Sequence, residues 1–520
     1  MNDFWHFFVT NRMQILHQTL RHLELTFAAL TVAVVIGIPL GIACTRYRKI
    51  SGPTLGAVGV IQTIPSIALL GFMIPLLGIG AIPAIVALFL YALLPIVRNT
   101  YAGINEVDAS VVEAARGMGM TGRQILTKVE LPLAMPVIFA GIRTATVISV
   151  GVATLCALIG AGGLGQFIFR GIALNNSIMI LAGALPAALL AILFDNILGF
   201  LEQRVGRLLK PLAWGLAVIL LVGGVWAAHS FFASANKLKI GVPPEFLERS
   251  DGWPGLTKRY DLHMPTVEMN AALMYKALKN GRVDVAVGYS TDGRIKAYHL
   301  KVLKDDKHYF PPYDAAPLVR TSTLQQHPGL RKVLNKLAGK ISTKKMTALN
   351  SRVDQNKEDA AAVAKDFLQK HGFKTSVHRS GSPDFLIGGK LQTEQYILGH
   401  MYKLLIENNT SLDVGLKMGL AGTKVVFNAL KNGEINMYPE YTGTGLHVLL
   451  KADSSTVKRL GNNPQKVYHY VKKHTQKRFN LSWLKPIGFN NTYALLMRRK
   501  EAKKLGIQTI SDLARYLKSH

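Results

Sequence analysis

Six long apolar runs fill the first 236 residues of the chain, and the residues after them contain no run of similar length. The runs cover residues 23–45, 55–77, 81–97, 134–159, 178–201 and 211–232. An α-helix needs about 20 apolar residues to cross a bilayer, and most of these runs reach that length. One such run could be a buried helix of a soluble protein. Six in succession predict a membrane domain over residues 1–236 with six transmembrane helices.

Basic residues are concentrated in alternate loops between these runs. Clusters of Lys and Arg follow the first run, separate the third from the fourth, and separate the fifth from the sixth. The two other loops, residues 78–83 and 160–176, contain a single basic residue, Arg170. Loops rich in Lys and Arg stay in the cytoplasm. We therefore expect a multi-pass protein of the cell membrane whose residues 237–520 form an extracellular or periplasmic domain.

Two ionisable residues lie well inside the apolar runs, Arg143 in the fourth and Asp195 in the fifth. A charge inside a membrane helix is costly and is usually retained for function. Each residue is therefore a candidate for a role in transport, and the alternative is that each marks the end of a run.

The second half of the chain has the pattern of an α/β domain. Residues 238–242 and 283–287 predict short strands, and residues 330–337 have the apolar spacing of a helix. Residues 273–293 and 425–445 are similar to each other and share Ala-Leu-Lys-Asn-Gly. Each copy predicts a helix ended by Asn-Gly, a strand, and a loop with a tyrosine and small hydroxyl side chains. Two such units facing each other predict two lobes with a cleft between them.

Charge also separates the two halves. Residues 1–236 contain 14 of the 61 Lys and Arg and 8 of the 31 Asp and Glu, which leaves a net charge of +24 on residues 237–520. An apolar half joined to a basic half excludes a simple soluble enzyme. Patterned apolar residues in both halves exclude a disordered or fibrous chain. The two cysteines, Cys44 and Cys156, lie in apolar runs, so the second half has no disulfide framework.

The longest cytoplasmic loop contains an ordered motif. Glu-Ala-Ala at 113–115 is followed after three residues by Gly119 and after nine more by Val129, with Leu-Pro at 131–132. The residue types favour a helix, a glycine turn and a second short helix before the proline. An ordinary pair of interfacial helices is the alternative reading.

This motif resembles the coupling loop of importer-type ABC transporter permeases, with Val129 where isoleucine is usual. The resemblance implies that the loop docks on a separate ATPase subunit. The coupling residues it implies are Glu113, Ala114, Ala115, Gly119, Leu131 and Pro132. The sequence contains no G-x-x-x-x-G-K-[ST] phosphate-binding loop. We therefore expect a transport subunit that is not an enzyme, with ATP hydrolysis on the partner.

Several segments of the second half resemble the substrate-binding proteins of importers for quaternary amines and compatible solutes. They are residues 289–293, 305–313, 386–399, 438–445 and 488–493. The resemblance implies a two-lobed periplasmic-binding-protein-like fold of type II.

The order of the segments is reversed relative to that family. The part similar to the family's C-terminal segment, 237–374, comes first, and the part similar to its N-terminal segment, 384–520, follows a linker at 375–383. We expect one circularly permuted domain, because two truncated domains in tandem would each lack part of a core. Permutation further predicts that His520 lies near Lys237.

The resemblance also implies a site for a quaternary ammonium group. Such a group has no N–H to donate and is attracted to aromatic faces. The implied cage residues are Tyr441, Tyr493, Tyr289 and Tyr313. The residues implied for a carboxylate or hydroxyl tail are Thr442, Asn491, Thr492, Ser290, Thr291, Gln392 and Thr393. Glycine betaine, carnitine, choline and related betaines such as ergothioneine fit this chemistry equally.

The sequence thus predicts the permease and substrate-binding subunit of an ABC importer, present in two copies with two ATPase subunits and without cofactor or metal. The alternatives are an importer of another amino-acid-like solute and a ligand sensor that does not transport. The positive charge of the outer domain suits attachment to anionic lipid or cell-wall polymers. Nucleic-acid binding is not expected, because no such motif occurs and the domain is predicted to lie outside the cell.

Overall fold

The computed structural model describes residues 2–174, 176–204, 238–249, 251–377, 381–420 and 422–519. Its contacts divide the chain into two compact units, Met1–Gly171 with Ser177–Lys237 and Ile172–Asn176 with Leu238–His520. Each unit is described by itself. The sixth apolar run, residues 211–232, lies outside the described residues.

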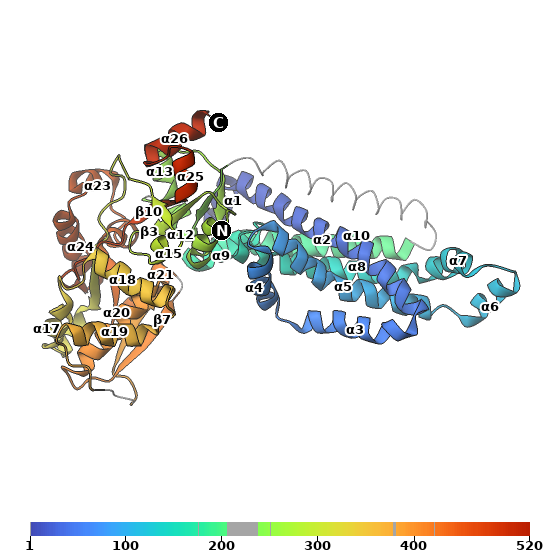
Figure 1. Ribbon diagram of the computed structural model, residues 1–520, viewed down its shortest axis with the longest axis horizontal. Coiled ribbons are helices and arrows are strands. Elements are labelled where there is room, and N and C mark those ends of the chain that lie inside the picture. The colour runs from blue at the N-terminus through green and yellow to red at the C-terminus, as the bar shows by residue number, and fades with distance from the viewer. Residues whose placement is uncertain are drawn as a thin grey trace. The chain divides into compact units, whose positions relative to one another are not determined.

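The first unit is a bundle of helices (Figure 1). Up to residue 204 the elements are α1 (Asn2–Thr10), α2 (Arg12–Arg46), α3 (Arg48–Thr63), α4 (Ser66–Leu77), α5 (Ala81–Asn105), α6 (Ala109–Gly117), α7 (Gly122–Ile125), the π-helical turn η1 (Leu126–Glu130), α8 (Leu131–Ala153), the 3₁₀ turn η2 (Leu155–Ile159), α9 (Gly165–Leu174) and α10 (Ser177–Arg204).

Four described helical segments are long and apolar enough to cross a membrane, namely Arg12–Arg46, Ala81–Asn105, Gly122–Ala153 and Ser177–Gln203. The second apolar run differs from a straight helix, because α3 and α4 meet at a bend of 100°. Ile64 at the bend is extended, with ψ at 126°. The cause is Pro65, since a proline disfavours helical geometry in the residue before it. If this bent pair is one span, the described residues contain five.

Small residues let α2 pack closely against α5. A Cβ atom on Gly37 would lie 2.9 Å from Ile96 Cγ2, and one on Gly41 would lie 2.6 Å from Thr100 Cβ. Membrane helices associate largely through such close packing, because lipid provides no hydrophobic drive between them. The membrane bundle therefore depends on glycine at these two positions.

The second unit consists of two lobes, each built around a five-stranded sheet. The strands are β1 (Ile240–Val242), β2 (Thr266–Glu268), β3 (Val285–Tyr289), β4 (Leu300–Val302), β5 (Ala315–Arg320), β6 (Phe385–Lys390), β7 (Val414–Leu420), β8 (Met437–Tyr441), β9 (Leu481–Trp483) and β10 (Tyr493–Arg498). The first sheet has the order β2-β1-β3-β10-β4 and the second β7-β6-β8-β5-β9.

Helices cover both sheets. They are α12 (Pro244–Glu248), α13 (Trp253–Tyr260), α14 (Ala271–Lys279), α15 (Arg294–Ala297), α16 (Thr321–Gln326), α17 (Leu330–Leu334), α18 (Thr343–Asp354), α19 (Ala360–Lys370), α20 (Thr393–Glu407), α21 (Thr423–Asn432), α22 (Thr442–Thr444), α23 (Ser454–Leu460), α24 (Pro464–Phe479), α25 (Arg499–Lys504) and α26 (Ile510–Ser519), with short turns η3 (Asn335–Leu337) and η4 (Gly445–Leu449).

Each sheet contains strands from both sides of the 375–383 linker. β10 enters the first sheet between β3 and β4, antiparallel to both, with Tyr493 opposite Tyr289. β5 enters the second sheet between β8 and β9, again antiparallel, with Ala315 opposite Tyr441. Neither sheet is complete without strands from both segments of the chain.

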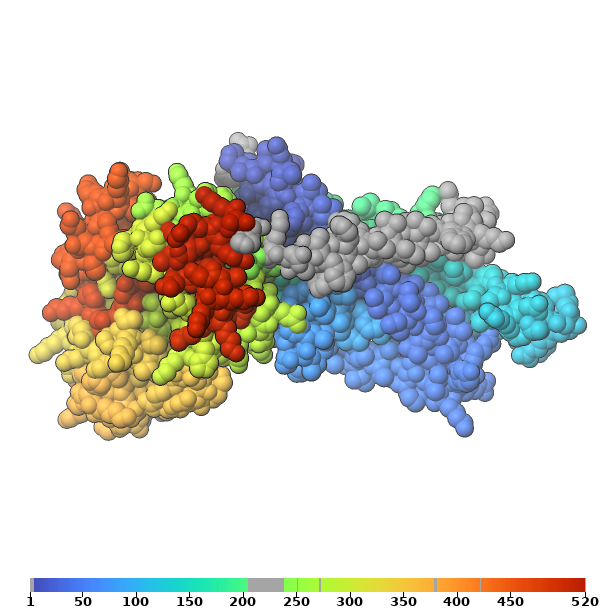
Figure 2. Space-filling model, turned by 45° about the horizontal axis from the view of Figure 1, so that its top comes forward, coloured from blue at the N-terminus to red at the C-terminus, as the bar shows by residue number. Residues whose placement is uncertain are grey.

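The C-terminal helix α26 packs on the first lobe. Lys518 Nζ lies 2.5 Å from the Asp261 carboxylate, and the Ser511 amide donates to Asp306 at 3.3 Å. In Figure 2 this red segment lies against the green residues that begin the unit. His520 and Lys237, whose proximity the sequence predicts, lie outside the described residues.

The repeated segment forms the same local structure twice. Helix α14 is followed by Gly281 at φ 70° and strand β3, and helix α21 by Gly433 at φ 84° and strand β8. Glycine suits these positions because it adopts positive φ without steric cost. β3 belongs to the first sheet and β8 to the second, so the repeat provides one strand to each lobe, as the sequence predicted.

Candidate functional site

A cavity lies between the two lobes of the second unit. Its lining residues are Glu245, Arg249, Tyr289, Tyr313, Lys390, Gln392, Thr423, Tyr441, Thr444, Asn491 and Tyr493. Strand ends supply several of them, because Tyr289 ends β3, Lys390 ends β6, Tyr441 ends β8 and Tyr493 begins β10. The antiparallel insertion of β10 brings its first residue to the edge where β3 ends.

Tyr493 is the centre of an aromatic cluster at this cavity. Its ring centroid lies 4.7 Å from that of Phe246, 5.3 Å from that of Tyr289 and 5.5 Å from that of Tyr313. Burial raises the pKa of Tyr289 to about 12, and it raises the pKa of Tyr493 well above the usual value of a phenol. The rings therefore stay neutral at physiological pH, and their faces can attract a cation.

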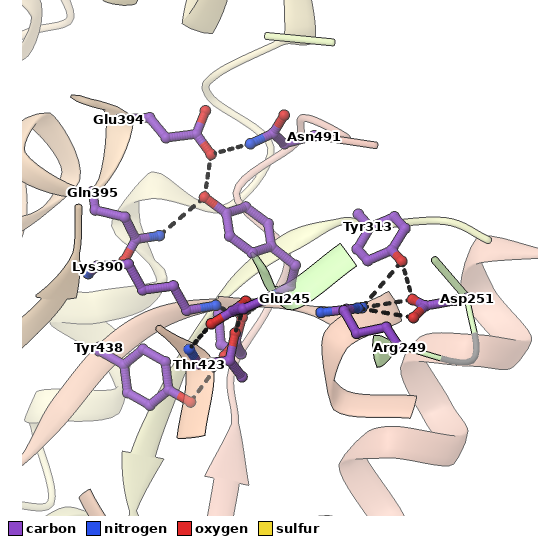
Figure 3. Close-up of polar contacts among 12 residues, drawn as sticks. Glu245, Arg249, Asp251, Tyr313, Lys390, Glu394, Gln395, Thr423, Tyr438 and Asn491 are labelled. Carbon is purple, nitrogen blue, oxygen red and sulfur yellow. Dashed lines mark hydrogen bonds and ion pairs between the residues drawn. The ribbon is translucent and has the colours of Figure 1, made fainter. Parts of the chain in front are cut away.

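Two buried cations also border the cavity, and each has an acidic partner. Figure 3 shows the pair of Arg249 and Asp251. The Asp251 carboxylate accepts from Arg249 at 2.8 and 2.6 Å, and Lys390 Nζ lies 2.6 Å from Glu440. The guanidinium carbon of Arg249 lies 5.5 Å from the ring centroid of Tyr493. Burial by itself would raise the pKa of Asp251, but the positive charge of Arg249 holds this pKa below its usual value. The site therefore contains N–H donors suited to an anionic group, although the charge of each cation is already balanced by its carboxylate.

A buried carboxylate holds Tyr441 in place. Glu394 accepts from the Tyr441 hydroxyl, from Asn491 at 2.6 Å and from Thr291 at 2.7 Å. Gln395 donates to the same tyrosine oxygen at 3.0 Å. Burial raises the pKa of Glu394 in spite of these donors. Thr291 follows β3 in the first lobe and Glu394 lies in α20 beside the second sheet, so this network links the two lobes.

Six of the eleven predicted ligand-binding residues line the cavity, namely Tyr289, Tyr313, Gln392, Tyr441, Asn491 and Tyr493. The other five are not among its lining residues. Thr442 donates to the Pro312 carbonyl, Ser290 to the Asn490 carbonyl, Thr291 to Glu394 and Thr393 to Asp354, and Thr492 immediately precedes Tyr493. A role of these five in binding stays a prediction.

Five lining residues were not predicted from the sequence, namely Glu245, Arg249, Lys390, Thr423 and Thr444. Arg249 and Lys390 are two of 47 basic residues in a strongly basic half, and no spacing distinguishes them. Lys390 does carry one signal. It ends an apolar strand, and a lysine buried in such a position needs a charged partner.

Residues 113–132 form a helical elbow in the first unit. Helix α6 carries Glu-Ala-Ala, Gly119 occupies the turn at φ 79°, and Thr121 and Gln124 form a capping box at α7. The π-helical turn η1 then leads into α8. Figure 1 shows α6 and α7 projecting beyond the end of α5. Such π turns are rare and are frequent at functional sites. The elbow has the helix–glycine–helix form that the sequence predicted.

An ion pair connects the base of this elbow to the first long helix. Glu130, the last residue of η1, is buried and pairs with Arg46 at the end of α2. Two contacts join the groups, one of them between Arg46 Nη1 and Glu130 Oε1 at 3.2 Å. The base of the elbow is therefore joined to α8 by the chain and to α2 by this ion pair.

We expect the single variants Glu130→Gln and Arg46→Gln to lower solute uptake per ATP hydrolysed about two- to tenfold. Arg46→Gln leaves the buried Glu130 carboxylate without its charged partner, and Glu130→Gln removes the charge that Arg46 contacts. The exchange Arg46→Glu with Glu130→Arg should restore part of the loss. The measurement is uptake and ATP hydrolysis by proteoliposomes that contain the chain and its ATPase. Arg48→Gln, an exposed neighbour, serves as the matched control. Equal uptake per ATP in all variants would show that the pair has no coupling role.

The two ionisable residues noted inside the apolar runs pair with each other. Arg143 of α8 contacts both oxygens of Asp195 of α10, at 2.6 and 2.8 Å, and Glu202 at 3.3 Å. The pairing balances charges that would be costly alone in a membrane helix. A role of either residue in transport stays a prediction.

Two protein families match the chain. One is described as the substrate binding domain of ABC-type glycine betaine transport systems and matches residues 229–370 and 386–520, more than half of the chain. The other is described as the binding-protein-dependent transport system inner membrane component and matches residues 37–207.

Individual relatives are similar in sequence to the membrane half of the chain. The glycine betaine/carnitine/choline transport system permease protein OpuCB of Bacillus subtilis is 46% identical over 205 residues, which are 39% of this chain and 94% of that protein. The carnitine transport permease protein OpuCB of Listeria monocytogenes is 47% identical over 38% of this chain and 91% of that protein. Among solved structures, a chain of the inward-facing MetNI methionine ABC transporter is 29% identical with a TM-score of 0.33, over 38% of this chain and 96% of that chain.

The two family matches and the permease relatives confirm the fold class and the transport role expected from the sequence. The protein is an integral membrane protein, and in the arrangement used for import its binding domain lies on the outer side. The chain belongs to the binding-protein-dependent ABC importers, and it combines their inner-membrane component with the substrate-binding domain of the glycine betaine transport systems.

Proposed function

We propose that this chain imports quaternary-ammonium compatible solutes of the glycine betaine, carnitine and choline type. The aromatic cavity is the observation that carries this proposal. A quaternary ammonium group donates no hydrogen bond, and each tyrosine face contributes about 0.5–2 kcal/mol to holding it. Tyr289, Tyr313, Tyr441 and Tyr493 all line the cavity. Of the two similar OpuCB permeases, the Bacillus subtilis protein is named for glycine betaine, carnitine and choline, and the Listeria monocytogenes protein for carnitine.

The polar lining suits the other end of such a solute. Arg249 and Lys390 supply charged donors for a carboxylate, and Gln392 and Asn491 supply amide groups. A zwitterion can thus place its ammonium group against the rings and its carboxylate against the two cations. We propose these residues, with the tyrosines, as the substrate site.

We propose that residues 237–520 form one circularly permuted binding domain. The sharing of strands supports this, since β10 completes the first sheet and β5 the second. The contact of α26 with Asp261 supports it as well, because it keeps the end of the chain on the lobe where β1 lies. A domain tethered to its permease also has a high effective concentration there.

We propose that two copies of the chain act with two ATPase subunits, which hydrolyse ATP and bind the elbow at Glu113–Pro132. The projecting α6 and α7, the glycine turn and the ion pair at Glu130 support this role. Closure of the two ATPase subunits would then move the elbow and, with it, the membrane-spanning helices α8 and α2.

Titration of the full chain in lipid nanodiscs tests the substrate class. Glycine betaine, carnitine, choline and ergothioneine are the ligands, and glycine is the matched control because it lacks only the three methyl groups of glycine betaine. We expect at least one quaternary amine to bind in the micromolar range and glycine to bind far more weakly. A folded protein that binds none of the four, or binds glycine equally well, would contradict the proposed function.

A further inference from the structure

Glu245 is the only acidic residue that lines the cavity within the described part of the chain. Both lining cations are already balanced, Arg249 by Asp251 and Lys390 by Glu440. Glu245 has no such counterpart, because its hydrogen bonds come from Thr423, from the backbone N–H at 2.7 Å and from the hydroxyl at 3.4 Å. The cavity therefore contains one carboxylate whose charge no described side chain neutralises.

Glu245 and its hydrogen-bond donor Thr423 lie in different lobes of the second unit. Glu245 lies in α12, directly after β1 of the first sheet, whereas Thr423 begins α21 beside the second sheet. Gly422 has φ at 78°, and a Cβ atom there would lie 2.4 Å from Glu245 Oε1. A residue with a side chain at this position would displace the carboxylate. The negative charge of Glu245 also contributes to the raised pKa of Tyr289 and of Tyr493, so it lies close to the aromatic cluster.

A carboxylate has about four acceptor positions, and Thr423 occupies two of those of Glu245. A trimethylammonium group is attracted to this charge but cannot fill the remaining acceptor positions, because it has no N–H, and a substrate carboxylate would be repelled. We propose that Glu245 is a specificity-determining residue that accepts a hydrogen bond from a donor on the substrate, either a hydroxyl or a ring N–H. The substrate is then a betaine with three recognised groups, namely the quaternary ammonium, the carboxylate and this donor. The assignment rests on the proposed function and narrows it.

Matched ligands test this assignment on the full chain in nanodiscs by calorimetry. Carnitine and γ-butyrobetaine (4-trimethylammoniobutanoate) differ only in one hydroxyl, and histidine betaine provides a ring N–H. A hydrogen bond to a charged acceptor corresponds to a preference of roughly ten- to hundredfold. We expect the better of the two donor-bearing ligands to bind tighter than γ-butyrobetaine by at least about tenfold on that basis.

Glu245→Gln should reduce this preference to about threefold or less, because a neutral acceptor is weaker than a charged one. Its amide oxygen can still accept from Thr423, so the contact between the lobes is retained, and a melting curve checks the fold. Glu248→Gln, the same change at an exposed position of the same helix, should keep the full preference.

The assignment is overturned if the wild-type chain binds γ-butyrobetaine as tightly as both donor-bearing ligands, or if Glu245→Gln keeps the preference. If Glu245→Gln fails to fold, the assignment is tested by the wild-type chain alone, through its preference for the donor-bearing ligands over γ-butyrobetaine. Binding of no quaternary amine at all is a different result, because it would reject the proposed function and this assignment together.

Discussion

Tyr493→Leu is expected to weaken binding of the quaternary-amine substrate by roughly 30-fold or more. Leucine removes a cation-binding face and three aromatic ring contacts, which together correspond to at least about 2 kcal/mol. The ring of Tyr493 lies within 5.5 Å of the ring centroids of Phe246, Tyr289 and Tyr313, so its loss also loosens the other cage residues. Titration of the full chain in nanodiscs measures the effect.

Tyr493→Phe is the matched variant, because it keeps the ring and removes only the hydroxyl. We expect its affinity to stay within about threefold of the wild-type value, since the aromatic face is what attracts the cation. Tyr470→Leu on α24, which is not among the residues that line the cavity, should bind normally. If Tyr493→Leu binds as tightly as Tyr493→Phe, the aromatic cage at this position is not the recognition element.

Gly119→Val is expected to reduce uptake at least about tenfold and to leave substrate binding unchanged. Gly119 has φ at 79°, a conformation that costs an L-residue about 1–2 kcal/mol and a β-branched residue more. The turn would therefore adopt another conformation and move α6 relative to α7. The measurement pairs uptake by proteoliposomes containing the ATPase with titration of the same preparation.

Gly52→Ala is the control for this change, because a Cβ atom there meets nothing within 4 Å and Gly52 lies in α3, outside the elbow. It should transport normally. Uptake by Gly119→Val equal to that of the wild type would remove the glycine turn from the coupling mechanism. Together with Tyr493→Leu, the pair of variants separates loss of binding from loss of coupling.

Local patterns in the chain predicted a large part of this protein. Transmembrane helices follow from uninterrupted apolar runs. The bend after α3 was not predicted, although its cause is also local, because Pro65 acts on the residue directly before it. The repeat predicted a helix, an Asn-Gly turn and a strand in each copy, because all three are set by neighbouring residues. It placed Tyr289 and Tyr441 in the loop after the strand, whereas the structure has them as the last residues of β3 and β8. The form of the elbow around Gly119 is likewise set by neighbouring residues.

The charged part of the site is not local, and it was missed. Arg249 contacts Asp251, which is only two residues away. Its contacts with Tyr313, just before β5, and with Tyr493, the first residue of β10, depend on where these two strands lie in the two sheets. Lys390 and Glu440 are 50 residues apart and meet because β6 and β8 are neighbours in the second sheet. Such pairs depend on which segments lie side by side, which periodicity and spacing do not encode.

By itself the sequence determined the membrane and binding halves and the helix–glycine–helix form of the elbow, because hydrophobic period and turn residues are properties of adjacent residues. The four tyrosines and the coupling role of the elbow were implied by the family resemblance. Only the tertiary structure decided that Arg249, Lys390 and Glu245 share a cavity with those tyrosines, and that four predicted hydroxyl residues donate hydrogen bonds to residues outside its lining. The physical reason is that a buried charge is placed by the partners that packing brings to it, and those partners come from distant strands and from the opposite lobe.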